Sequence, residues 1–159
     1  MKLSIAAAAL LALTTLAPLS VGAAPEDKDN FAGTWILQIP HSSIRSNFKE
    51  TMTVGYKDGF QEYQTVVDNN GKKSGKRYRA KPDGQPYAYY DVVTGKKRGM
   101  MRMTQTRPWM EITSFVEDDP SIPGPAGIEH WLSNDGHTLF SVLKNKEGAI
   151  TNILSWDRQ

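Results

Sequence analysis

The chain contains no cysteine. This absence excludes disulfide bonds, zinc–thiolate sites, iron–sulfur clusters and a thiol nucleophile. It also excludes anchoring through a lipidated cysteine. The length of 159 residues suits one domain and is too short for a typical TIM barrel, which needs about 250 residues.

Sequence motifs for common chemistries are also missing. The three histidines form no His-x-His or His-Glu-x-x-His pattern, and no Gly-x-Ser-x-Gly motif or glycine-rich phosphate loop occurs. The run Lys72-Lys73-Ser74-Gly75-Lys76 is not a P-loop, because its leading glycine is misplaced. We therefore expect no metal site, no bound cofactor and no serine-hydrolase nucleophile.

The N-terminal segment has the features of a secretory signal peptide. A positive Met1-Lys2 start precedes a 13-residue run, 5–17, in which only two threonines are not apolar, and Val21-Gly22-Ala23 offers small residues for cleavage. A membrane-spanning helix would need about 20 apolar residues, although an uncut anchor stays the alternative. We predict a signal peptide at 1–23 and a mature domain at 24–159 that is periplasmic or secreted.

Basic residues are concentrated in the middle of the chain. The segment from Lys72 to Arg107 carries eleven basic residues and two acidic ones. This pattern indicates attraction of an anionic ligand, a lipid headgroup or an acidic partner, or else a solvated basic face. Contact of the 72–107 surface with a membrane is left open. Export argues against nucleic acid as a partner.

Turn signals and β-branched or aromatic runs alternate along the mature chain. No stretch of 12 residues keeps a helical period, and Asp-Gly and Asn-Gly pairs recur. We predict an all-β antiparallel up-and-down meander of about nine strands, closed as an 8–10 stranded barrel or packed as a sandwich. The strands are expected near 33–39, 48–56, 59–67, 75–81, 86–92, 98–105, 109–117, 127–132 with 137–143, and 148–157. The proline-rich segment 118–127 is expected to be a loop.

Three short motifs resemble those of small secreted bacterial lipocalin-like proteins. They are Gly33-Thr34-Trp35, Pro82-Asp83-Gly84-Gln85-Pro86-Tyr87, and 133–139, which reads Ser-Asn-Asp-Gly-His-Thr-Leu. The resemblance implies a calycin-type barrel that is open at one end and encloses an apolar cavity. It also implies that Trp35 plugs the other end, with Gly33 beside it and Arg158 stacked on the ring.

Candidate ligand-binding residues lie on the strands predicted between residues 75 and 132. His130 shares the parity of Ile128 and Leu132, so it should face inward, either as a satisfied core histidine or as a functional group. Aromatic and sulfur side chains favour a loose apolar cavity, although they also fill ordinary cores. We expect a ligand tail on Tyr89, Met101 and Met103, and an anionic headgroup near Arg79 or Arg102.

The sequence leaves three functions open. The first is the binding of a small hydrophobic or amphipathic molecule, anionic ones included. The second is a barrel enzyme of the isomerase, cyclase or hydratase type that uses His130 with a tyrosine. The third is a structural envelope protein with a filled core. We favour the binding protein over the enzyme, and we expect a monomer.

Overall fold

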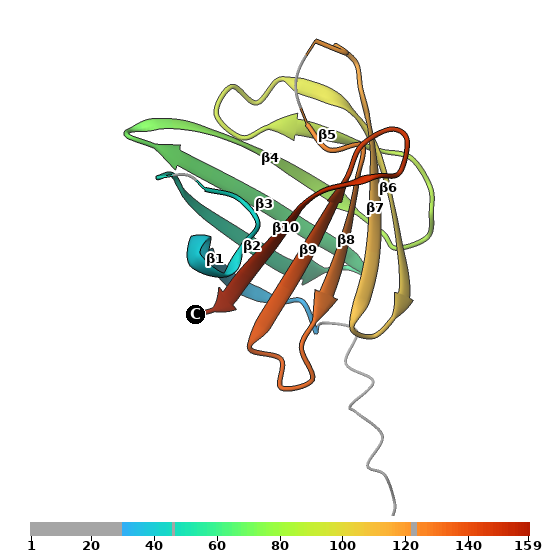
Figure 1. The fold of residues 1–159 in the computed structure, drawn as a ribbon. Helices are drawn as coiled ribbons and strands as arrows, with labels where there is room; N and C mark the ends of the chain where they lie inside the picture. The colour runs from blue at the N-terminus through green and yellow to red at the C-terminus, as the bar shows by residue number, and fades with distance from the viewer. Residues whose placement is uncertain (1–29, 46, 122–123) are drawn as a thin grey trace, which may run out of the picture.

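The computed structural model describes residues 30–45, 47–121 and 124–159, so the predicted signal peptide lies outside it. The described chain forms ten strands, one short 3-10 helix (η1, Ile39–His41) and no α-helix (Figure 1). Within these residues no helix is long and apolar enough to span a membrane. The strands are β1 (Gly33–Leu37), β2 (Lys49–Lys57), β3 (Phe60–Asn69), β4 (Lys72–Ala80), β5 (Tyr87–Asp91), β6 (Lys97–Arg107), β7 (Met110–Glu117), β8 (Gly127–Leu132), β9 (Thr138–Lys144) and β10 (Ile150–Arg158).

The strands form one closed antiparallel barrel. Each strand pairs with its neighbours in sequence, and β1 pairs with β10 to close the ring. The predicted all-β meander and its closure as a barrel are therefore confirmed, and the sandwich alternative is excluded. The expected number of about nine strands is one too low, because 127–132 and 137–143 form the separate strands β8 and β9.

Two hairpins show how local sequence fixes the strand register. Asp58 and Gly59 connect β2 to β3 with φ angles of 53° and 75°, and Asn70 and Gly71 connect β3 to β4 with 54° and 86°. Positive φ at both central residues is the geometry of type I′ turns, which Asp-Gly and Asn-Gly favour. β4 therefore begins at Lys72, three residues before the predicted start.

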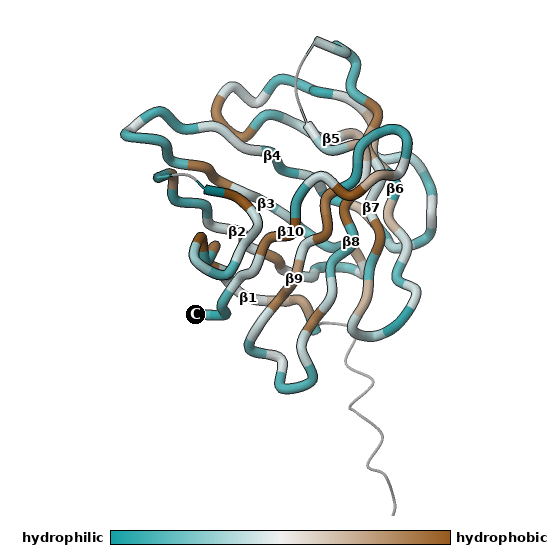
Figure 2. The backbone as a smooth tube through the Cα atoms, in the orientation of Figure 1, coloured by the Kyte–Doolittle hydropathy of each residue, from teal (hydrophilic) through white to brown (hydrophobic). Residues whose placement is uncertain are grey.

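Alternation along each strand separates the barrel interior from its surface. The apolar core gathers inward-facing side chains from all the strands, and Figure 2 shows hydrophilic turns at the barrel ends. Because the meander alternates direction, the turns fall at two ends. We call the end with the 133–137 turn and the C-terminus the Trp35 end. The opposite end carries the 70–71 and 145–149 turns, the connection 92–96, and the described segments 38–45, 47–48, 118–121 and 124–126.

The Trp35 end is closed by packed side chains. Trp35 is fully buried, and its indole N–H donates to the Phe31 carbonyl at 3.0 Å. The Arg158 guanidinium lies 4.5 Å from the centre of the Trp35 ring and donates to the Asn30 carbonyl at 2.7 Å. Gly33 has a φ of +142° beside them, a backbone conformation that L side chains rarely adopt.

Candidate ligand site

Four charged side chains line the interior near the opposite end of the barrel. They come from four strands, and we call them the charged cluster: Glu50 (β2), Lys76 (β4), Arg98 (β6) and Glu117 (β7). Glu50 shares the parity of the buried Met52, and Lys76 that of the buried Tyr78, so strand alternation turns both inward. The cluster therefore places four charged groups on the inner wall near this end of the barrel.

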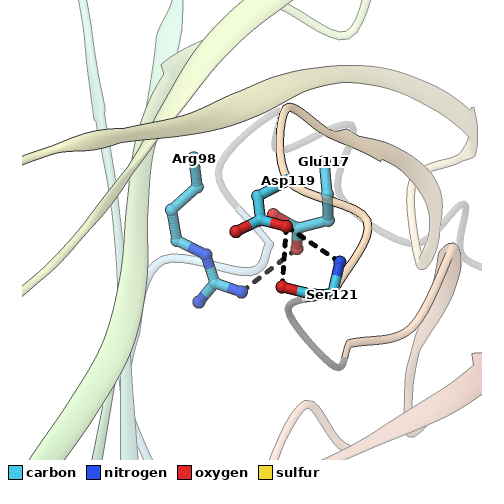
Figure 3. Close-up of polar contacts among 4 residues, drawn as sticks. All are labelled: Arg98, Glu117, Asp119 and Ser121. Carbon is cyan, nitrogen blue, oxygen red and sulfur yellow. Dashed lines mark hydrogen bonds and ion pairs between the residues drawn. The ribbon is translucent and has the colours of Figure 1, made fainter.

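Arg98 reaches this region because the ladder between β5 and β6 is irregular. Tyr89 pairs with Gly99 and Tyr90 with Lys97, which leaves Arg98 as the extra residue of a bulge. Its guanidinium forms an ion pair with Glu117 at 3.1 Å (Figure 3). The same group lies 6.0 Å from the centre of the Tyr89 ring. The bulge thus places a cation beside inward-facing groups.

The turn that follows β7 is held by its own hydrogen bonds. The Asp119 carboxylate accepts from the backbone N–H of Ser121 at 2.9 Å and from its hydroxyl at 2.7 Å (Figure 3). These bonds lower the pKa of Asp119. Asp119 is therefore committed to the turn, and Glu117 is the carboxylate that faces Arg98.

Lys76 and Glu50 have strongly perturbed pKa values. Burial lowers the pKa of Lys76 to about 8 although Glu50 opposes the shift, and burial raises the pKa of Glu50 to about 7 although Lys76 opposes it. The Lys76 ammonium sits 3.9 Å from the centre of the Phe115 ring, yet both Lys76 and Glu50 stay partly exposed. The two groups are desolvated by the surrounding protein but still reached by solvent.

Three polar atoms around the cluster are buried and make no hydrogen bond of good geometry. They are the Tyr89 hydroxyl, Arg98 Nε and Glu117 Oε2. Tyr89 is only 1% exposed, and burial, followed by a side-chain hydrogen-bond interaction with the Glu117 carboxylate, raises its pKa, so these two groups lie near each other. Buried polar groups in folded proteins are normally paired, since an unmade hydrogen bond costs about 1–3 kcal/mol. An acceptor from another molecule would complete both donors, the Tyr89 hydroxyl and Arg98 Nε.

His130 lies deeper in the barrel and belongs to a short chain of hydrogen bonds. Ser141 Oγ lies 2.9 Å from Nδ1 of His130 and accepts the Trp156 indole N–H at 2.8 Å. Burial, and then Lys76, lower the pKa of His130 to about 3. His130 is thus a neutral, hydrogen-bonded core histidine.

A second polar group crosses the interior toward the Trp35 end. The Gln61 amide donates to Glu111 across the barrel at 2.8 Å and to the Tyr56 hydroxyl at 3.1 Å. Burial raises the pKa of Glu111 to about 7, although the hydrogen bond from Gln61 opposes the shift. Glu111, His130 and Trp35 line a void of about 160 Å³. No part of this void is wide enough to admit a water-sized sphere. This half of the barrel is filled.

The structure brings together only part of the predicted ligand site. Tyr89, Met101, Met103 and His130 all face the interior, each with no more than 3% of its surface exposed. Arg79 and Arg102 do not join them at the interior, and a headgroup contact at either arginine stays a prediction. Each arginine is one residue away from an inward-facing side chain, and alternation therefore turns it to the outer surface.

The residues that sequence reasoning missed are the inward charges. Glu50 continues the Met52–Val54 alternation, and Lys76 continues that of Tyr78 and Ala80, so parity alone could have found them. Arg98 could not have been found in this way, because its orientation depends on the bulge.

Comparison with known proteins does not assign a function to these residues. No protein-family model matches the chain, and no curated protein is significantly similar to it. In the described part of the chain, no group of three His, Asp or Glu side chains is arranged to hold a metal ion.

Proposed function

We propose that this barrel binds a small amphipathic anion, with its headgroup at the charged cluster. The observation that carries the proposal is the pair of buried donors, the Tyr89 hydroxyl and Arg98 Nε, that make no hydrogen bond of good geometry. An anionic headgroup would accept a hydrogen bond from the Tyr89 hydroxyl and from Arg98 Nε. Lys76, which solvent still reaches, would supply the compensating charge.

The apolar part of the ligand would lie nearer the opposite end of the barrel than Met101 and Met103, where the sequence analysis placed it. Met101 and Met103 are packed within the core and leave no surface for a tail. Ile44, Phe48 and Leu143 are only partly buried against the core, and their positions put them at the opposite end. We propose that the ligand tail contacts this apolar surface. Burying it would contribute a free energy of about 25 cal/mol for each Å², before the costs of association are subtracted.

The enzyme alternative has less support. His130 donates or accepts within a filled interior, and Trp156 occupies one acceptor site of the serine beside it. A general base needs a substrate within hydrogen-bond reach, and no room for one adjoins this imidazole. Binding without chemistry is therefore the function that we propose.

Export belongs to the same proposal. The lipocalin-like resemblance and the predicted leader both suggest a periplasmic or secreted carrier. Expression of the full chain followed by N-terminal sequencing of the soluble product should give Ala24 as the first residue. A soluble protein that keeps Met1 would contradict export while leaving ligand binding intact.

The binding proposal is tested with a chain-length series of linear fatty acids and the matched alcohols. Heteronuclear NMR should show saturable shifts at Tyr89, Phe115 and Glu117, with affinity that rises with tail length. Each alcohol should bind more weakly than its acid. No saturable response from any chain would contradict the proposal and favour a filled-core structural protein.

A further inference from the structure

The outer wall of the barrel carries a hollow of about 640 Å³ that is separate from the interior cluster. It lies over β2 to β5, where two rows of cross-strand neighbours run side by side. One row is Thr53, Gln64, Arg77 and Tyr90, and the other is Gly55, Glu62 and Arg79. All seven lining residues in these rows have the outward parity of their strands, so the hollow opens to solvent.

Arg77 is the uncommitted cation of this hollow. Arg79 lies 3.4 Å from Glu62 and 3.5 Å from Asp58, and it stacks 4.2 Å over the Phe60 ring. Arg77, in contrast, has no carboxylate partner among the residues that the structure describes. Its guanidinium carbon lies 5.9 Å from the centre of the Tyr90 ring. Its hydrogen-bond donors are therefore available to a ligand.

The remaining lining residues are polar, and Gly55 leaves open space among them because glycine has no side chain. A Cβ atom added at Gly55 would meet nothing within 4 Å, so the floor of the hollow is bare at that point. Gln64 and Thr53 present amide and hydroxyl groups beside it, and the Tyr90 ring is 37% exposed. The volume falls within the range of about 300–1,000 Å³ that is typical of small-molecule sites.

We propose that this hollow binds an acidic sugar, a pyranose ring that carries a carboxylate. The guanidinium of Arg77 matches a carboxylate in a two-point hydrogen bond. The exposed face of Tyr90 suits the C–H face of a sugar ring, while Gln64, Thr53 and Glu62 meet its hydroxyl groups. The Gly55 floor leaves space for the ring.

Polyanions with repeated phosphates fit this surface less well. Their affinity depends on several phosphate contacts at once. The hollow offers one uncommitted guanidinium, and Glu62 at its centre is a carboxylate that would repel a second phosphate. A single acid group with neutral hydroxyls around it is the better match.

The test is an NMR titration of the full mature protein with glucuronate, with glucose and with inorganic phosphate. Glucuronate should shift the amides of Thr53, Gln64, Arg77 and Tyr90 and should bind more tightly than either of the other two. Arg77→Gln should weaken glucuronate binding about fivefold or more. Arg102→Gln, which removes an exposed arginine elsewhere on the outer wall, should leave it unchanged.

Filling the hollow provides an independent variant. Gly55→Leu should abolish glucuronate binding, and its thermal unfolding should show that the barrel still folds. Equal affinity in the Arg77 and Arg102 variants would overturn the proposal, and so would phosphate binding as tight as glucuronate. Shifts confined to Tyr89 and Glu117 would assign the sugar to the interior and also overturn it.

Discussion

Arg158 stacks on Trp35 where the first and last strands of the barrel meet. The two residues are register partners between β1 and β10, and the guanidinium lies 4.5 Å from the centre of the indole ring. The pairing of these strands is short, because only three Cα pairs join them. The aromatic–cation contact therefore reinforces the seam that closes the ring.

Trp35→Ala should destabilise the barrel by about 3–5 kcal/mol, the usual range for truncating a large buried aromatic residue. The indole is fully buried, so its removal leaves a cavity and an unpaired Phe31 carbonyl. Urea unfolding followed by circular dichroism measures the loss. Arg158→Met should cost about 0.5–2 kcal/mol through the lost cation–π contact. A loss near zero for Trp35→Ala would show that this residue does not close the barrel.

Glu111 and His130 should make the free energy of unfolding depend on pH in opposite directions. The carboxyl has an ordinary pKa of 4.5 and a folded value of about 7, so its stabilising effect is present below pH 4.5 and is lost as pH rises toward 7. The imidazole has an ordinary pKa of 6.5 and a folded value of about 3, so its effect is present above pH 6.5 and is lost as pH falls toward 3. Between pH 4.5 and 6.5 the two slopes oppose each other.

Single substitutions should separate these slopes. Relative to the parent protein, Glu111→Gln should gain stability as pH rises from 4.5 to 7, and His130→Gln should lose stability as pH rises from 3 to 6.5. The free energy of unfolding from denaturant melts at several pH values measures both. Parallel curves for the parent and Glu111→Gln would show that Glu111 titrates normally in the folded protein.

Replacing either of two strand glycines with alanine should change the stability by different amounts. A Cβ at Gly99 would lie 2.0 Å from the Val116 carbonyl oxygen, whereas a Cβ at Gly55 would meet nothing within 4 Å. Gly99→Ala must move backbone at the bulge that positions Arg98, so it should cost about 1–3 kcal/mol or more. Gly55→Ala should be close to neutral. Similar thermal midpoints for the two variants would contradict the close approach of β6 to β7.

Strand parity explains how much of this barrel the sequence reveals. Val54 with Met52, and His130 with Ile128, alternate cleanly, so strand positions and the burial of His130 follow from period two. The same parity directs Arg79 and Arg102 outward, since each lies between two buried side chains of its strand. The Arg98–Glu117 pair depends on a bulge and on contacts between β6 and β7, and a single strand's pattern does not specify these.

The filled Trp35 end is likewise a property of packing rather than of pattern. Met103, Trp156 and Leu139 would suit a cavity wall or a solid core equally well by composition. Only their joint arrangement leaves them each with no more than 2% of their surface exposed. The opposite end differs in its charged cluster, whose side chains are partly exposed, whereas Gln61 and Glu111 are fully buried.

The central claim is that Lys76 and its neighbours hold an anionic headgroup inside the barrel. Calorimetric titration of dodecanoate and dodecanol into the parent, Lys76→Met and Lys73→Met tests it most directly. Lys73 lies on the same strand with the outward parity, so its variant removes the same charge outside the barrel. Lys76→Met should weaken dodecanoate and leave dodecanol unchanged, while Lys73→Met should alter neither. Equal dodecanoate affinity in both variants would contradict the account.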